Sequence, residues 1–406
     1  MTETITTICC IAGGGPAGMM LGFLLARAGV PVVVLEKHKD FLRDFRGDTV
    51  HPSTLEMMHE LGLLDEFLKL PHSKVDHVSM QVGADRVKIA LIGLPTVCQY
   101  IAFMPRWDFL NFLAAKARKY KTFDLRMRAE ATDLIVENDE VVGVRAKTDD
   151  GALDVRAQLV VGCDGRHSTV REKAGFQSDD LGAPMDVLWF RISRKASDGE
   201  DIAGHIESGR MLVMLNRDDY WQCAYVIPKG GIDAVKARGL DQFRKAVGEM
   251  APFDLGDRTG EIKSWDDVKL LTVTVDILRK WYRPGLICIG DAAHAMSPIG
   301  GVGINLAVQD AVAAANALAE PLRRGSLTQQ TLAAIQERRA CPTKLTQRLQ
   351  LVLQNNIIGP AMQNTGERPR APWVMKMLQW PLLNRIPGRA IAVGVRPEHI
   401  QTPEIL

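Results

Sequence analysis

The stretch that decides the fold runs from residue 5 to residue 36 and reads ITTICCIAGGGPAGMMLGFLLARAGVPVVVLE. It predicts an apolar strand over Ile5–Ile11, a helix over Pro16–Ala28 and a second apolar strand over Val30–Leu35. The pattern G-x-G-x-x-G lies between the first strand and the helix, and Glu36 ends the second strand about twenty residues later. The stretch therefore predicts a βαβ unit that binds a dinucleotide.

Each part of this motif has a physical role. Gly13 permits a tight turn, Gly15 lets the backbone approach a pyrophosphate, and Gly18 permits close packing of the helix on the strand. The helix N-terminus attracts negative charge, and Glu36 is expected to accept hydrogen bonds from ribose hydroxyls. The residues predicted to bind the cofactor here are Gly13, Gly15, Pro16, Ala17, Gly18, Glu36 and Lys37.

Composition and charge exclude several classes of protein. The 406 residues are 46% hydrophobic, which is enough for one large core or two interleaved cores. Fifty Lys and Arg against 48 Asp and Glu leave no excess of positive charge for nucleic acid. Seven cysteines without a C-x-x-C pair predict neither disulfides nor a metal site. The absence of a signal peptide or a long apolar run predicts a cytoplasmic protein.

Two further loops carry a family resemblance. Cys163 to Arg171 reads CDGRHSTVR after a buried strand, and Gly290 to His294 reads GDAAH after another. The second loop continues into Pro298 to Asn305, which reads PIGGVGIN. Together with the N-terminal glycine motif, over about residues 5 to 345, this sequence resembles the FAD-dependent aromatic hydroxylases of the p-hydroxybenzoate hydroxylase type.

The resemblance implies an FAD monooxygenase. Its members use NADPH or NADH and dioxygen to hydroxylate an aromatic substrate through a C4a-hydroperoxyflavin. The resemblance implies that Asp291 bonds the ribityl chain, that Asp164 lies near the cofactor, and that Arg46 and Arg106 contact FAD. The sequence contains no second G-x-G-x-x-G unit after a strand, so the nicotinamide is expected to bind transiently. The substrate is expected to be small, largely apolar and aromatic or phenolic.

The glycine-rich segment after Pro298 has a rationale of its own. Reduced flavin carries negative charge at N1 and O2, and a helix that starts beside the ring supplies backbone donors to that charge. The residues predicted at the flavin ring are Pro298, Gly300, Gly301, Val302, Gly303, Ile304 and Asn305. His294 is not assigned as a base, because a histidine hydrogen-bonded within the loop explains it equally well. No residue is singled out as catalytic.

The expected architecture is an α/β fold with an α+β insert. An FAD-binding Rossmann-like domain over 1–70, 101–180 and 278–345 is interleaved with a mainly antiparallel substrate domain over 71–100 and 181–277. A helical tail over 346–406 completes the chain. Local expectations include a capping box formed by Ser53 and Glu56 and a strand over 270–276.

One wall of the substrate pocket is expected on the inserted sheet. The candidates to line it are Trp189, Arg191, Gln222 and Tyr225. Side chains alternate between the two faces of a strand, and this alternation does not identify the face that is turned toward the flavin. Two alternative interpretations stay open as well: Trp189 packs in the core, and Arg191 lies at the surface.

The tail and the function each leave several interpretations open. The tail carries apolar residues interrupted by Pro360, Pro372 and Pro381, with basic residues among them. It is interpreted as a membrane-surface contact, an aid to binding a lipophilic substrate, a segment packed over the core or a dimer contact. Monomer and homodimer are both open. An oxidase or reductase on the same scaffold and a non-catalytic redox sensor are the competing functions, whereas the halogenase pattern W-x-W-x-I-P is absent.

Overall fold

Strand β1 (Glu3–Ala12) lies at the centre of an eight-stranded sheet. The computed structural model describes residues 2–42, 49–83, 85–91, 93–199, 203–207, 209–360 and 385–405. Strand β1 pairs in parallel with β11 (Gly151–Gly162) on one side and with β2 (Val32–Glu36) on the other. Parallel strands buried on both faces carry continuous apolar runs, as β2 does. The other strands of this sheet are β8 (Phe123–Met127), β9 (Glu130–Glu137), β10 (Glu140–Thr148), β19 (Tyr282–Arg283) and β20 (Leu286–Cys288).

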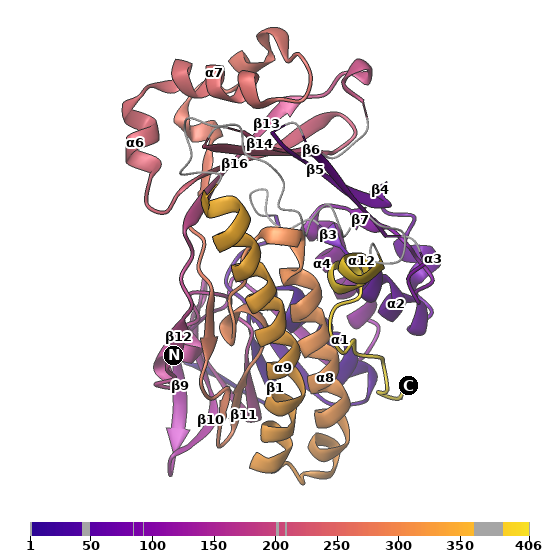
Figure 1. Ribbon diagram of the computed structural model, residues 1–406. Helices are drawn as coiled ribbons and strands as arrows, with labels where there is room; N and C mark the ends of the chain where they lie inside the picture. The colour runs from indigo at the N-terminus through magenta and orange to yellow at the C-terminus, as the bar shows by residue number, and fades with distance from the viewer. Residues whose placement is uncertain are drawn as a thin grey trace.

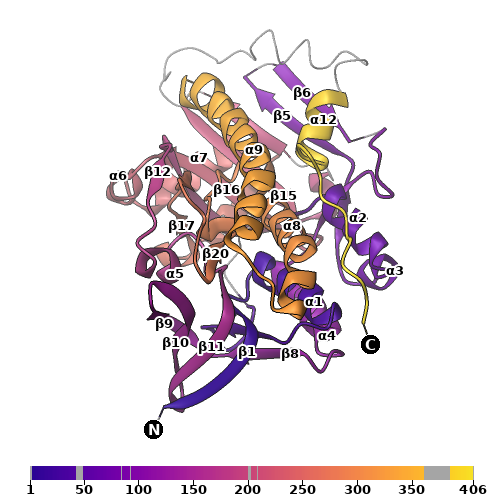
Figure 2. The same cartoon turned by 90° about the horizontal axis from the view of Figure 1, so that it is seen from below.

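Four helices pack together beside this sheet. Helix α1 (Pro16–Arg27), which follows β1 directly, contacts both α4 (Arg106–Ala117) and α8 (Gly303–Arg324). Figure 2 shows α8 lying between α1 and the long helix α9 (Gln329–Leu353). Six of the fourteen buried residues of α8 are alanines, so the neighbouring helices approach it closely.

A second sheet of seven strands lies above the first in Figure 1. Its order is β17 (Lys269–Leu271), β13 (Met185–Ser193), β16 (Tyr220–Pro228), β15 (Arg210–Asn216), β14 (Ala203–Glu207), β5 (His77–Val82) and β6 (Asp85–Ala90). All neighbouring pairs are antiparallel except β14 with β5. Two segments far apart in the sequence therefore build one sheet, as an insert between parts of an α/β fold requires.

The two faces of the second sheet have different partners. Leu188, Phe190 and Tyr225 point to the outer face, where α7 (Leu240–Met250) covers them. Figure 1 shows α7 and α6 (Ile232–Ala237) on that side. The residues that alternate with them, including Val187 and Ala224, form a separate apolar cluster on the inner face. The inner face is therefore the one turned toward the first sheet.

Short elements connect these layers. They are β3 (Thr49–Val50), α2 (Pro52–Glu60), α3 (Leu64–Phe67), β4 (Ser73–Val75), β7 (Ile101–Phe103), α5 (Thr169–Lys173), β12 (Ser178–Asp180), η1 (Ala196–Asp198), η2 (Gly256–Glu261), η3 (Trp265–Asp267), β18 (Asp276–Leu278), η4 (Gly290–Ala292), η5 (Ile299–Gly301), η6 (Gln354–Ile358) and α12 (Arg385–Ala392). Strand β7 joins β3 and β4 in a three-stranded sheet, and β12 pairs with β18. Helix α12 contacts β6 of the second sheet.

Two local predictions are wrong. Helix α2 begins at Pro52 with His51 as its N-cap, so Ser53 lies inside the helix, and the Glu56 carboxylate accepts a hydrogen bond from the Val97 backbone N–H at 2.8 Å. The strand predicted over 270–276 is two strands, since β17 ends at Leu271 and β18 begins at Asp276 in another sheet. In both cases the observed partner is distant in sequence.

The last described residues form hydrogen bonds with the α/β part of the molecule. The Arg27 guanidinium donates to the Thr402 carbonyl at 2.8 Å, and the Ile405 N–H donates to the Arg27 carbonyl at 2.8 Å. The Glu60 carboxylate accepts from the Ile400 N–H at 2.8 Å. Most of the predicted tail, residues 361–384, lies outside the described residues, and its predicted first residue, 346, falls inside α9.

One helical stretch has the length and composition of a membrane span. Among the described residues it is Ile299–Arg324, and 72% of its apolar window is buried inside the protein. This stretch comprises η5 and α8, which pack between α1 and α9. Its apolar character is explained by its place in the core.

A buried ion pair on the outer face of the second sheet yields a stability prediction. The Asp198 carboxylate accepts from both terminal nitrogens of Arg258, at 2.6 and 2.8 Å, and from Trp221 Nε1 at 2.9 Å. The Arg258 guanidinium beside Asp198 holds the pKa of that carboxyl well below its usual range. We expect Asp198→Asn to lower the free energy of unfolding by about 3–5 kcal/mol, because Arg258 is left buried and uncompensated.

Urea denaturation at neutral pH measures this loss. The folded carboxyl has a lowered pKa, so its contribution is present above the unfolded pKa and is lost as the pH falls below about 4. Asp241→Asn is the control, since Asp241 pairs with Arg244 at 2.7 Å but is 91% exposed, and we expect a change below about 1 kcal/mol. Equal losses in the two variants would contradict the prediction.

Candidate active site

The glycines of the first loop satisfy two close backbone contacts. Gly13 has φ +106°, and a Cβ there would lie 2.4 Å from the Cys163 carbonyl oxygen. A Cβ on Gly18 would lie 1.9 Å from the Gly13 carbonyl oxygen. Gly15 differs, because a Cβ there would meet no protein atom within 4 Å and the residue borders a large cavity. The loop is therefore closed on the protein side and open toward the cavity.

Glu36 braces the same loop from the end of β2. One carboxylate oxygen accepts from the Gly14 N–H at 3.0 Å, and the other accepts from the His38 N–H at 3.0 Å. Glu36 and Lys37 both border the cavity. Pro16 and Ala17 border it too, whereas Gly18 lies behind them against the strand.

Asp164 holds the loop that follows β11. Its carboxylate accepts hydrogen bonds from the Ser168 hydroxyl and from the Val170 N–H, the latter at 3.1 Å. Burial raises the pKa of Asp164, and these hydrogen bonds oppose that rise. Ser168 also caps α5 by accepting from the Arg171 N–H at 2.9 Å. Asp164 borders the cavity, but its oxygens are engaged in shaping the loop.

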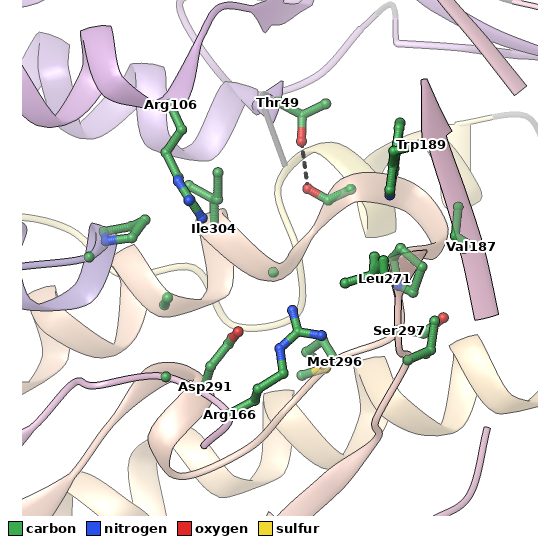
Figure 3. Close-up of a pocket in the computed structure, with 18 of the residues that line it drawn as sticks. Thr49, Arg106, Arg166, Val187, Trp189, Leu271, Asp291, Met296, Ser297 and Ile304 are labelled. Atoms are coloured by element: carbon green, nitrogen blue, oxygen red, sulfur yellow. Dashed lines mark hydrogen bonds between the residues drawn. The ribbon is translucent and has the colours of Figure 1, made fainter. Parts of the chain in front are cut away.

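Asp291 borders the cavity at the start of the Gly290 loop. Figure 3 shows its carboxylate pointing toward the space between Arg106 and Arg166. Burial raises the pKa of Asp291, and the positive charges of Arg166, His294 and Arg106 act in the opposite direction. An acceptor in this position suits a hydroxyl-bearing chain that donates hydrogen bonds.

Asp310 of α8 sets the geometry of the Gly290 loop and was not found from the sequence. It is fully buried, and its Oδ2 accepts from the Gly290 N–H at 3.1 Å and lies 2.6 Å from His294 Nε2. Its Oδ1 accepts from Arg339 Nε at 2.8 Å, and Arg339 also contacts Glu398 at 3.2 Å. Although burial favours protonation, His294 and Arg339 hold the pKa of Asp310 below its ordinary value.

His294 therefore has a structural partner outside its own loop. It is buried against Trp281, with ring centroids 5.1 Å apart, and does not border the cavity. No short sequence window links His294 to Asp310 or Arg339, because both lie on helices further along the chain. A buried Asp or Arg in a helix carries no mark in the sequence that distinguishes it from a solvent-facing charge.

The glycine-rich segment turns sharply before α8. Gly300 and Gly301 have φ values of +77° and +62°, and a Cβ on Gly301 would lie 2.6 Å from Thr49 Oγ1. The Thr49 hydroxyl donates to the Gly301 carbonyl at 2.7 Å, as Figure 3 shows. A Cβ on Gly303, which borders the cavity, would meet no protein atom within 4 Å. The first turn of α8 thus offers backbone N–H groups to the cavity.

Asn305 holds this helix start in place. Its side-chain oxygen accepts from the His51 N–H and from the Thr54 hydroxyl, both at 2.8 Å. Its amide nitrogen donates to the Thr49 carbonyl at 3.2 Å. Pro298, Gly300, Gly301, Gly303 and Ile304 border the cavity, whereas Val302 and Asn305 do not.

A row of buried glutamines holds the segment that leads into these glycines. Gln347, Gln350 and Gln354 share one face of α9 and its continuation η6 by their spacing of three and four residues. Their side-chain amides donate at 2.8–3.0 Å to the carbonyl oxygens of Asp276, Ala295, Ser297 and Ile299 and to the Ser297 hydroxyl. Nothing in the sequence signals this role, because a buried Gln and a solvated Gln look alike in a helical pattern.

The two arginines predicted at the cofactor have different outcomes. Arg106 begins α4 and borders the cavity, where Figure 3 shows its guanidinium pointing toward Ile304. Arg46 lies outside the described residues. Arg166 also borders the cavity and faces Asp291, and sequence reasoning did not single it out.

The predicted substrate residues divide between the two faces of the second sheet. Trp189 and Gln222 border the cavity from the inner face. Arg191 shares that face by register but is exposed beyond the cavity, where it stacks over Tyr220 at 4.7 Å. Tyr225 lies on the outer face, packed against Phe243, and does not reach the cavity. The structure thus does not place Arg191 or Tyr225 at the pocket.

The cavity joins the two halves of this site. It encloses about 630 Å³ between the glycine loops and the inner face of the second sheet. The loop half offers glycine backbone, helix N-termini and Asp291, which fit a pyrophosphate, a ribityl chain and an electron-rich ring system. The sheet half is mostly apolar, with Met185, Val187, Met211, Val213, Ala224, Val226 and Leu271 among its residues. The open space at Gly15 and Gly303 leaves room for the expected FAD.

The helix start at Gly301 yields a first test. Valine at Gly301 would collide with Thr49 and strain the backbone at φ +62°, so the N–H groups of the first turn of α8 should be displaced. We expect Gly301→Val to make reduction of the flavin harder by about 1–3 kcal/mol, as measured by redox titration. Gly325→Val, at the other end of α8 with φ +63° and away from the cavity, controls for backbone strain without the collision. An unchanged reduction potential in folded Gly301→Val would refute this role.

The Asp310 cluster yields a second test. Asparagine at Asp310 leaves Arg339 and His294 facing a neutral amide, and the Gly290 loop loses its charged acceptor. We expect Asp310→Asn to weaken FAD binding about tenfold or more, measured by fluorescence titration of the apoprotein. Glu320→Gln on the same helix is the control, since the pairs of Glu320 with Arg323 and Arg324 are exposed. Unchanged FAD affinity in a folded Asp310→Asn variant would contradict the expectation.

Comparison with known proteins gives the family. Residues 6–349 match the family model described as FAD binding domain. The chain is 32% identical over 372 residues to 6-methylpretetramide 4-monooxygenase of Streptomyces rimosus, covering 90% of this chain and 88% of that protein. It is 27% identical over 327 residues to dialkyldecalin synthase of Streptomyces rugosporus, covering 77% of this chain but only 64% of the synthase.

A solved structure shows the same fold. The crystal structure of PqsL, a probable FAD-dependent monooxygenase from Pseudomonas aeruginosa, superposes with a TM-score of 0.75 at 20% identity. The match covers 89% of this chain and 99% of PqsL. The chain therefore belongs to the FAD-binding-domain family of FAD-dependent aromatic hydroxylases, the flavoprotein monooxygenases similar to p-hydroxybenzoate hydroxylase.

Proposed function

We propose that this FAD-dependent monooxygenase hydroxylates an aromatic, largely apolar substrate held under the inner face of the second sheet. The observation that carries the proposal is one continuous cavity, whose loop half suits FAD and whose sheet half is apolar. Hydroxylation of an aromatic ring needs both parts in contact. A relative named 6-methylpretetramide 4-monooxygenase supports a polycyclic aromatic as one form of this substrate class.

The cofactor-binding roles are part of this proposal. Gly13 and Gly15 would admit the pyrophosphate at the start of α1, and Glu36 would meet the ribose beside its present backbone partners. Asp291 would accept from the ribityl hydroxyls. Asp164 would act through the loop it shapes, since its oxygens already accept two hydrogen bonds.

The protein's own groups have two tasks in the reaction, beside the cofactor. When bound, FAD supplies the redox chemistry, accepting electrons from NADPH or NADH and activating dioxygen. The backbone N–H groups at Gly303 and Ile304 lie at a helix start that favours negative charge on the neighbouring ring. The apolar side chains of the sheet exclude water from the substrate, which protects reactive species from hydrolysis.

The finer assignments stay proposals. We propose the division into an FAD-binding domain and a substrate domain at the boundaries given above, a cytoplasmic location, and a monomer or homodimer. A peripheral membrane contact of the tail is supported by Leu349 and Val352, which are exposed apolar residues of α9 beside the basic Arg348.

The proposal predicts that substrate controls reduction of the flavin. One flavin must meet the nicotinamide and then dioxygen, so the correct aromatic compound should accelerate bleaching by NAD(P)H through better binding to one state. Labelled dioxygen should then deliver one heavy oxygen atom to the aromatic product, as mass spectrometry would detect. Reactions without the aromatic compound measure the NAD(P)H oxidation that is not coupled to hydroxylation. Label found only in peroxide or water while substrate is consumed would identify an oxidase or reductase.

A further inference from the structure

Two buried hydrogen-bond donors face the substrate half of the cavity. The Trp189 side chain is 9% exposed and Gln222 is 1% exposed, and both border the cavity. Neither Trp189 Nε1 nor Gln222 Nε2 has a hydrogen-bond partner within the part of the chain that the structure describes. Leaving such donors buried and unmatched costs about 1–3 kcal/mol each, so a ligand that accepts from them gains that energy.

The orientation of the Gln222 amide is fixed by a neighbour. Arg217 Nε donates to Gln222 Oε1 at 2.8 Å, which requires the amide NH₂ to point away from Arg217. The Arg217 guanidinium itself borders the cavity and lies over the Phe103 ring at 5.0 Å. A positive charge therefore stands directly behind the amide donor.

Strand register brings the two donors together. Residue 191 pairs with residue 222, and Trp189 pairs with Ala224, so Trp189 and Gln222 are diagonal neighbours on one face. Side chains in diagonal positions of an antiparallel pair lie within reach of a common group. Figure 3 shows Trp189 and Val187 near the same strand, among the side chains that line the cavity.

The described charged side chains that border this half of the cavity are of one sign. The described polar residues that border it from the second sheet and the turn after β15 are Ser79, Trp189, Arg217 and Gln222. The bordering carboxylates, Glu36, Glu130, Asp164 and Asp291, all belong to the loop half. The described sheet half contains no Asp, Glu, His or Tyr at the cavity that could take up a proton. A site of donors and positive charge selects an oxygen that already carries negative charge.

We propose that Trp189 Nε1 and Gln222 Nε2, backed by Arg217, bind an anionic oxygen of the substrate, so the enzyme takes up aromatic phenolates or enolates in their ionised form. The inference rests on the proposed aromatic substrate of this cavity. It assigns specificity to two donors and makes a protein base on the sheet side unnecessary. Binding should follow the ionisation of the ligand itself.

Binding to the FAD-loaded protein without NAD(P)H tests this inference. The probes are 4-nitrophenol, 2-hydroxy-1,4-naphthoquinone and alizarin, which offer one to three rings and change colour on ionisation, together with their O-methyl ethers. We expect at least one phenolate to bind with its pKa lowered relative to water, and the matching ether to bind at least tenfold more weakly. Trp189→Phe and Gln222→Met should each weaken phenolate binding about tenfold and leave ether binding within twofold.

Controls separate a lost donor from a disturbed fold. Tyr225→Phe removes a hydroxyl from the outer face of the same strand and should leave both ligand classes unchanged. Gln222→Glu keeps the shape of the side chain but faces the ligand with negative charge, so phenolate binding should fall further than in Gln222→Met. If either donor variant loses FAD, the affinity of the other donor variant and of Gln222→Glu for the phenolate still tests the inference.

Three outcomes would overturn the inference. They are equal affinity for phenolate and ether, unchanged phenolate affinity in folded Trp189→Phe and Gln222→Met, and failure of all three phenolates to bind. The proposed function fails separately, since labelled oxygen can be absent from the product even where phenolates bind through these donors. Conversely, labelled product from an enzyme indifferent to both substitutions would reject only the donor site.

Discussion

The buried carboxylate of Asp310 is the interaction on which the active-site geometry depends. It receives the Gly290 N–H, His294 and Arg339 within 3.1 Å, with no part of its side chain exposed. A buried anion of this kind is stable only while its partners remain in place, so α8, α9 and the Gly290 loop cannot shift independently. Glu398, bonded to Arg339, adds the C-terminal segment to the same cluster.

A second constraint acts beside it and uses neutral groups. The glutamines of α9 bind backbone carbonyls of the segment 295–299, which joins Asp291 to the glycines before α8. Asp276 links this segment to the other cofactor loop, because its carboxylate accepts from the Ala295 N–H at 3.0 Å and from Arg171 at 3.1 Å. The loops that sequence motifs identify are therefore positioned by residues outside the motifs.

This arrangement explains how far sequence reasoning could go. Gly18 was recognisable because its close approach to the Gly13 carbonyl oxygen leaves glycine as the fitting residue, and this demand acts within a few positions of the chain. The mixed α/β fold followed from apolar runs and the inserted strands. Asp310, Arg339 and Gln350 were missed because burial decides their role, and a helical charge or amide carries no mark of burial. The capping box predicted at Ser53 and Glu56 does not form, and the Glu56 carboxylate accepts a hydrogen bond from the backbone N–H of Val97, which is distant in sequence.

The inserted sheet shows the same limit at single-residue scale. Gln222 and Tyr225 lie three positions apart on β16, so their side chains point to opposite faces, one to the cavity and one to the α7 layer. A sequence with alternating apolar residues on both faces carries no sign of which face meets a helix. The structure resolves the ambiguity through α7, whose apolar side covers the Tyr225 face and leaves the Gln222 face to the cavity. The position of one helix thus decides which strand residues can determine specificity.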